Sequence, residues 1–159
     1  MRTLIFLNLL LGFLILVLLV ASLVAEAPVM GALGIPLGLG SGRLILGGRA
    51  IMVVGLLAVP LGHIILTRLQ AIVGTVALGD PFVSANAERL ETIAWTVLAL
   101  EILHVVVGAV AYLSSSGPHS LNLGWNLSIA RWLALLFCFV LARVFAQGTQ
   151  MRDDIEGTV

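Results

Sequence analysis

The sequence predicts an all-α integral membrane protein in which four transmembrane helices form an antiparallel bundle. Hydrophobic residues make up 60% of the 159 residues and charged residues only 10%, whereas soluble domains are about 45–50% apolar. Nearly all of the charge lies between four long apolar runs. A soluble core cannot absorb this excess of apolar residues, so the lipid bilayer is the expected solvent. The whole chain, residues 1–159, is expected to form one membrane domain.

The four expected spans cover approximately residues 4–24, 50–72, 93–113 and 127–145. Each is close to the ~20 residues that a helix needs to cross the hydrocarbon core, and a helix satisfies its own backbone hydrogen bonds there. The first run is longer than the ~7–15 apolar residues of a secretory signal. We therefore expect it to be retained as a span.

The connections between the spans differ in how well they are defined. The outer connection from Pro28 to Gly48 is rich in glycine, and no regular structure is expected there. The inner connection is expected to be a helical hairpin, because Gly79 can end a helix and Ser84 can cap the next one. A short polar cytoplasmic tail, residues 147–159, follows the last span.

The placement of arginine predicts the orientation, because cytoplasmic loops retain positive charge. An even number of spans puts both termini on the same side of the membrane. If that side is the cytoplasm, five arginines lie inside and three lie outside. The inner set is Arg2, Arg68, Arg89, Arg143 and Arg152, and the outer set is Arg43, Arg49 and Arg131. Both termini are therefore expected in the cytoplasm.

Glu101 and His104 lie within the third apolar run, and His63 lies within the second. A charged side chain at the bilayer centre costs about 3 kcal/mol and normally has a partner or a function. At ~1.5 Å per residue, His63 and Glu101 should lie within about one helical turn of each other in depth. A structural hydrogen bond between them is the first interpretation. A pair that relays protons or senses pH is the alternative, because histidine titrates near neutrality.

No cofactor and no metal site are expected, although two hypotheses deserve weighing. His63 and His104 could be axial ligands of a haem, but the depth argument separates them by roughly two helical turns. Glu101 and His104 have the Glu-x-x-His spacing of di-metal bundles. Such sites need a second copy of this motif and two further carboxylates, which one chain does not supply.

The sequence also argues against enzymatic activity and direct nucleic-acid binding. No serine or cysteine nucleophile has a histidine base beside an acid, and no glycine-rich phosphate loop precedes a helix. The formal net charge is zero and all eight basic residues are arginines, so no lysine-rich surface is present to neutralise phosphates. The single cysteine, Cys138, lies in an apolar run and is expected to be a small core residue.

Two motif blocks resemble the bacterial family catalogued as domain of unknown function 2975. The first is Gly79-Asp80-Pro81-Phe82 followed by Asn86 and Arg89-Leu90, and the second is Ala142-Arg143-Val144-Phe145 with Gly148, Met151-Arg152-Asp153-Asp154 and Glu156-Gly157-Thr158-Val159. The resemblance covers most of the chain from the second span onward. It implies a small four-span protein of the bacterial inner membrane whose motif blocks face the cytoplasm. It also implies a companion, a small helix-turn-helix transcription factor.

The function expected from these observations is a non-enzymatic membrane sensor or regulator with a signalling role. The hairpin and the tail would form one cytoplasmic surface whose acids attract a basic DNA-binding partner. The simpler interpretation is that these residues only cap helices and solvate the membrane boundary. The alternatives are an accessory subunit bound to other membrane subunits and a proton- or haem-handling bundle. The candidate docking residues are Asp80, Phe82, Asn86, Arg89, Arg143, Arg152, Asp153, Asp154 and Glu156.

Overall fold

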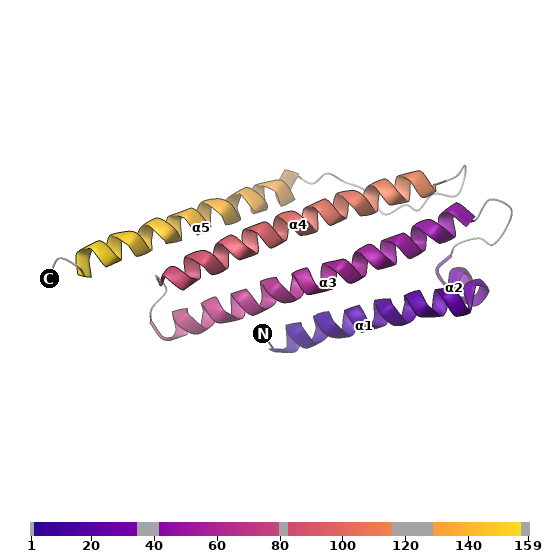
Figure 1. The fold of residues 1–159 in the computed structure, drawn as a ribbon, viewed down its shortest axis with the longest axis horizontal. Coiled ribbons are helices and arrows are strands. Elements are labelled where there is room, and N and C mark those ends of the chain that lie inside the picture. Colours follow the sequence, from indigo (N-terminus) through magenta and orange to yellow (C-terminus); the bar gives the residue numbers. More distant parts are fainter. Residues whose placement is uncertain (1, 35–41, 80–82, 116–128, 157–159) are drawn as a thin grey trace. The chain divides into compact units, whose positions relative to one another are not determined.

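The computed structural model describes residues 2–34, 42–79, 83–115 and 129–156, and every regular element in these ranges is an α-helix. Figure 1 shows the helices along the chain: α1 (Arg2–Val24), α2 (Glu26–Ala32), α3 (Gly42–Ala77), α4 (Ser84–Ser114) and α5 (Ile129–Glu156). The prediction of an all-α protein is thereby confirmed for the described residues. The chain divides into two compact units. The first comprises Met1–Ile5, Leu61–Ala99 and Leu127–Val159, and the second comprises Phe6–Pro60 and Leu100–Asn126.

Three of the helices are longer than the spans that hydropathy predicts. Helix α3 has 36 residues, which is about 54 Å at 1.5 Å per residue, and the hydrocarbon core of a bilayer is only about 30 Å thick. Helix α4 has 31 residues and α5 has 28. Helix α5 continues to Glu156, so most of the predicted tail is helical. Each of these helices therefore carries turns that extend beyond its apolar segment.

The expectation that the outer connection lacks regular structure is wrong for part of its length. Residues Glu26–Ala32 form α2, and α3 already begins at Gly42. Met30 of α2 is completely buried and clusters with Leu44 and Ile45 of α3. This apolar contact stabilises a helix of seven residues that would be too short to persist alone.

An arginine on α3 also ties α3 to the end of α1 and to α2. The Arg49 guanidinium lies 2.7 Å from the Glu26 carboxylate and donates a second hydrogen bond to the Ser22 carbonyl oxygen. Ser22 is buried, and its hydroxyl donates to the Leu19 carbonyl oxygen at 2.7 Å. The bond from Arg49 occupies the Ser22 carbonyl, one of the last four carbonyls of α1, which have no partner within the helix.

Helices α1 and α3 pack against each other in antiparallel directions within the second unit (Figure 1). The Asn8 side-chain amide donates to the Val59 carbonyl oxygen at 3.0 Å. Gly12 also lies against Val59, whereas Gly55 lies against Ile15. Small residues therefore allow close helix approach, and a polar side chain adds an interhelical hydrogen bond, as expected in a medium without a hydrophobic force between helices.

The turn of the α3–α4 hairpin in the first unit lies within one residue of its predicted position. Gly79 follows α3 with a φ of 84°, a left-handed conformation that favours glycine, and α4 begins at Ser84. The fully buried Asn86 joins the two helices: its amide donates to the Thr75 hydroxyl oxygen at 2.7 Å. Arg89 donates to the Asn86 side-chain oxygen at 2.7 Å. We call these three side chains, Thr75, Asn86 and Arg89, the hairpin clasp.

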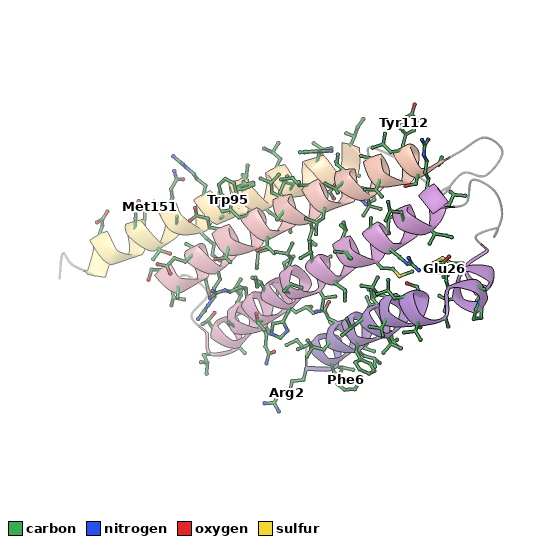
Figure 2. The ribbon with its side chains drawn as sticks, turned by 45° about the vertical axis from the view of Figure 1, so that its right-hand side comes forward. Arg2, Phe6, Glu26, Trp95, Tyr112 and Met151 are labelled. Carbon is green, nitrogen blue, oxygen red and sulfur yellow. The ribbon has the colours of Figure 1, made fainter. Side chains whose placement is uncertain are left out.

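Large apolar side chains cover the outside of the helices. Phe6 is 65% exposed and Tyr112 is 74% exposed, and Figure 2 shows both pointing away from the helices that carry them. Such a surface would aggregate in water but is suited to lipid. Within the described residues, four helical segments are long and apolar enough to cross a membrane: Arg2–Val24, Gly42–Ala77, Ser84–Ser114 and Trp132–Met151.

Candidate functional site

A groove of about 600 Å³ lies between the first turns of α4 and the last turns of α5, entirely within the first unit. Its α4 wall is formed by Ser84, Ala87, Glu88 and Glu91. Its α5 wall is formed by Phe139, Ala142, Arg143, Ala146, Gln147, Thr149 and Gln150. The groove thus joins residues from the predicted hairpin with residues from the predicted tail.

Helical spacing explains why these side chains share one groove. The α4 residues follow each other at steps of three, one and three positions, so they form a stripe along one face of the helix. The α5 residues from Phe139 to Ala146 repeat this spacing, and Gln147, Thr149 and Gln150 continue the stripe by one more turn. Helices α4 and α5 run in opposite directions, since the start of α4 meets the later turns of α5. Two parallel stripes on neighbouring helices form the walls of a continuous groove.

Small side chains keep the groove open. Ala87 projects from α4, while Ala142 and Ala146 project from α5. At the end of the groove towards the middle of both helices, Phe139 packs edge-on against Trp95, with ring centroids 5.4 Å apart and ring planes at 86°. This edge-to-face arrangement is favourable for aromatic pairs and fixes the spacing of the two helices at that end.

The two walls of the groove carry opposite charges. Glu88 and Glu91 are exposed on α4, and Arg143 is exposed on α5. Among the described residues, the side chains of these three make no ion pair or hydrogen bond with each other or with any neighbour. Their charged groups are thus accessible to a ligand in the groove. Gln147 and Gln150 add neutral donors and acceptors.

The candidate docking residues fall into different places. Asn86 and Arg89 belong to the hairpin clasp, on a face of α4 different from the groove. Arg143 lines the groove, and Asp154 is exposed on α5. The remaining candidates are not placed. Asp80 and Phe82 lie outside the described residues, and only the backbone is described for Arg152, Asp153 and Glu156.

Several groove residues were not among the sequence-derived candidates. The amides of Gln147 and Gln150 and the small residues of the walls carry no chemical motif. Their common signal is positional: they repeat at intervals of three and four on the polar end of α5. The sequence contains that periodicity, but it does not indicate which helix lies opposite these residues.

The three ionisable residues of the apolar runs lie in different units. His63 belongs to the first unit, and Glu101 and His104 belong to the second. The Nδ1 atom of His63 is buried and has no hydrogen-bond partner among the described residues, while its backbone carbonyl accepts the Thr67 hydroxyl at 2.9 Å. The hydrogen bond from His63 to Glu101 stays a prediction, and haem ligation by His63 and His104 stays the less favoured hypothesis.

The described helices and their exposed apolar surface define a class: an α-helical protein with helices suited to crossing a membrane several times. The chain belongs to the family described as Protein of unknown function (DUF2975), which matches residues 18–159. The resemblance in the two motif blocks is thus confirmed, and the match also includes residues 18–24, the last two turns of α1. No curated protein and no solved structure matches the chain.

Proposed function

We propose that this protein is a non-enzymatic regulator in the bacterial inner membrane that binds a cytoplasmic partner in the α4–α5 groove. In this proposal the four apolar helices form one antiparallel bundle with both termini in the cytoplasm. The distribution of arginine supports that orientation. The partner is a protein with a basic surface, and the family resemblance favours a small helix-turn-helix transcription factor.

The observation that carries the proposal is the shared groove of hairpin and tail. Its walls come from two segments separated by about 50 positions in the sequence, yet they are brought together at one end of the first unit. Glu88 and Glu91 offer two exposed carboxylates to a basic side chain, and Arg143 offers one guanidinium to an acid or an amide. Such charge patterns contribute mainly to partner choice and association rate.

The hairpin clasp supports the proposal because it fixes the α4 wall of the groove. Asn86 is fully buried and bonded to Thr75, so the start of α4 is fixed on α3 while its other face lines the groove. A binding surface built on fixed helices loses less conformational entropy when a partner docks than a surface built on loops. In this view Asn86 and Arg89 hold the docking surface in shape.

Site-specific photo-crosslinking in cells tests the proposal. A photoreactive residue replaces Ala146, which is exposed and lines the groove, or Phe137, which is 65% exposed outside it. We expect a soluble DNA-binding protein to be crosslinked from Ala146 and not from Phe137. Glu88→Gln with Glu91→Gln should weaken that crosslink about threefold to fivefold, as expected for two exposed ion pairs. Transcription of the partner's targets should change in parallel.

Other outcomes separate the alternatives. Glu26→Gln, which removes an exposed carboxylate of the second unit, is the control and should leave the crosslink unchanged. Crosslinking of integral membrane proteins from Phe137 alone, in fixed stoichiometry, would make the chain an accessory subunit. Signalling that depends on pH and is lost in Glu101→Gln would favour proton handling by His63, Glu101 and His104. A Soret band in the purified protein would favour haem binding by His63 and His104.

A further inference from the structure

The α4–α5 groove lies at the level where apolar sequence gives way to polar sequence. Its α4 residues, Ser84 to Glu91, precede the third apolar span, and its α5 residues, Phe139 to Gln150, cross the end of the fourth. Trp95 follows Glu91 by one helical turn and is 57% exposed. Exposed tryptophan is typical of the membrane–water interface. These positions put the groove beside the phospholipid head groups.

The groove carries both signs of charge, so it can also hold a zwitterion. A primary ammonium has three N–H donors and can bond to both Glu88 and Glu91. A phosphate diester can accept two parallel hydrogen bonds from the Arg143 guanidinium. Because the carboxylates and the guanidinium lie on opposite walls, a head group with both charges can contact both walls at once.

The volume of the groove is also typical of a binding site for a small molecule. Its volume of about 600 Å³ is within the roughly 300–1,000 Å³ usual for small-molecule sites. Ala87, Ala142 and Ala146 leave room for the head group between the helices. Phe139 provides an apolar contact for the glycerol and the first acyl carbons, at the end of the groove nearer the membrane interior.

We infer that the groove binds a phosphoethanolamine group, with its ammonium at Glu88 and Glu91 and its phosphate at Arg143. The inference rests on the proposed function only for the position of the groove at the membrane surface. A bound head group and a docked protein segment compete for the same walls. The abundance of phosphatidylethanolamine in the adjacent leaflet would then set how often the partner can bind, which gives the regulator a membrane-derived signal.

Tryptophan quenching in lipid nanodiscs tests this inference on the purified protein, with no partner present. Trp125→Phe and Trp132→Phe leave Trp95 as the single fluorophore beside the groove. In one sample, phosphatidylethanolamine carries brominated acyl chains and phosphatidylglycerol is unbrominated. In a second sample, the bromine is on phosphatidylglycerol instead, and the quenching of Trp95 in the two samples is compared as a ratio. We expect brominated phosphatidylethanolamine to quench Trp95 about threefold to fivefold more than brominated phosphatidylglycerol does, which is the effect of two partly exposed ion pairs.

Two comparisons identify the groove as the cause of the preference. Glu88→Gln with Glu91→Gln should bring the ratio of the two lipids to about one, because the ammonium loses its ionic partners. Asp154→Asn removes an exposed acid of α5 outside the groove and should leave the ratio unchanged. If the double variant does not fold, high salt applied to the protein with intact groove residues should lower the ratio by screening.

Soluble glycerophosphoethanolamine separates the two possible sources of the ligand. If millimolar amounts abolish the lipid preference, the head group alone suffices for binding; if they do not, the membrane lipid is the ligand. A ratio of one in the protein with intact groove residues, or a ratio that the double glutamine variant does not change, overturns the inference. Neither result bears on partner docking, which the crosslinking experiment tests separately.

Discussion

The packing of α1 on α3 predicts that Gly12→Ala destabilises the protein. A Cβ atom at position 12 would lie 2.9 Å from Val59 Cγ1 and 3.1 Å from Cγ2. Valine is β-branched and has essentially one allowed rotamer in a helix, so its methyl groups cannot turn away. The two helices must instead move apart by a few tenths of an ångström, and this movement also strains the hydrogen bond from Asn8 to the Val59 carbonyl oxygen.

The expected cost follows from two opposing terms. Overpacking a close contact typically costs about 1–3 kcal/mol. Replacing glycine by alanine within a helix returns up to about 1 kcal/mol through helix propensity. We therefore expect Gly12→Ala to lower the free energy of unfolding by up to about 2 kcal/mol.

Equilibrium unfolding in mixed detergent micelles measures this free energy, and the same helix pair offers a matched control. In Gly55→Ala the new Cβ would meet Ile15 Cδ1 at 3.6 Å, an ordinary contact, so this variant should be as stable as the parent or slightly more stable. Adding Val59→Ala to Gly12→Ala removes the clashing methyls and should make the double variant less destabilised than the sum of the single ones. Equal stability of Gly12→Ala and Gly55→Ala would refute the reasoning.

Three further variants test the polar contacts. Asn8→Leu removes the interhelical hydrogen bond to Val59 and should lower the free energy of unfolding by about 0.6–1.7 kcal/mol; no loss in the same detergent titration would contradict this role. Thr75→Val removes the partner of the buried Asn86 amide and should lower the free energy of unfolding by about 1–3 kcal/mol. Hydrogen exchange in the α3–α4 hairpin should become faster. Unchanged exchange there would argue against the clasp. Glu26→Gln breaks an exposed ion pair and should lower the free energy of unfolding by less than about 1 kcal/mol. High salt should remove this difference in stability. A salt-independent loss would mean that the carboxylate acts through something other than its charge.

Local backbone chemistry made the α3–α4 hairpin predictable. Gly79 ends α3 through its positive φ, as expected from its residue type. Helix α4 begins at Ser84, one residue earlier than a capping serine at that position predicts. The positions of the apolar runs were predictable for the same reason, since each is a property of one stretch of chain. The full lengths of the helices were not, because hydropathy reports where a helix is apolar and not where its hydrogen bonds stop.

Helix α2 shows what a one-dimensional pattern lacks. Its seven residues include a proline and a glycine, and its sequence resembles that of an irregular connection. Its order comes from the burial of Met30 against Leu44 and Ile45, a contact between two segments that no local pattern contains. Pro28 is compatible with the helix because it lies in the first turn, where its missing N–H is not needed.

The candidate site was predictable as two polar stripes and not as a groove. The sequence marks the polar start of α4, but it does not say which of its faces meets which neighbouring helix. Asn86 bonds to α3 and Arg89 bonds to Asn86, and these contacts form the clasp. Glu88 and Glu91 line the groove with α5. Residues one or two positions apart on a helix face different directions, so neighbours in the sequence serve different purposes.

Cysteine accessibility tests the central claim, that the groove faces the cytoplasm, most directly. Cys138→Ser gives a chain without cysteine, since Cys138 is the only one. Gln147→Cys, exposed in the groove, and Ala27→Cys, exposed on α2, are then labelled with a membrane-impermeant maleimide. We predict that Gln147→Cys reacts only in inverted membrane vesicles and Ala27→Cys only in intact spheroplasts. Labelling of Gln147→Cys from the outer side would contradict both the orientation and the docking of a cytoplasmic partner in the groove.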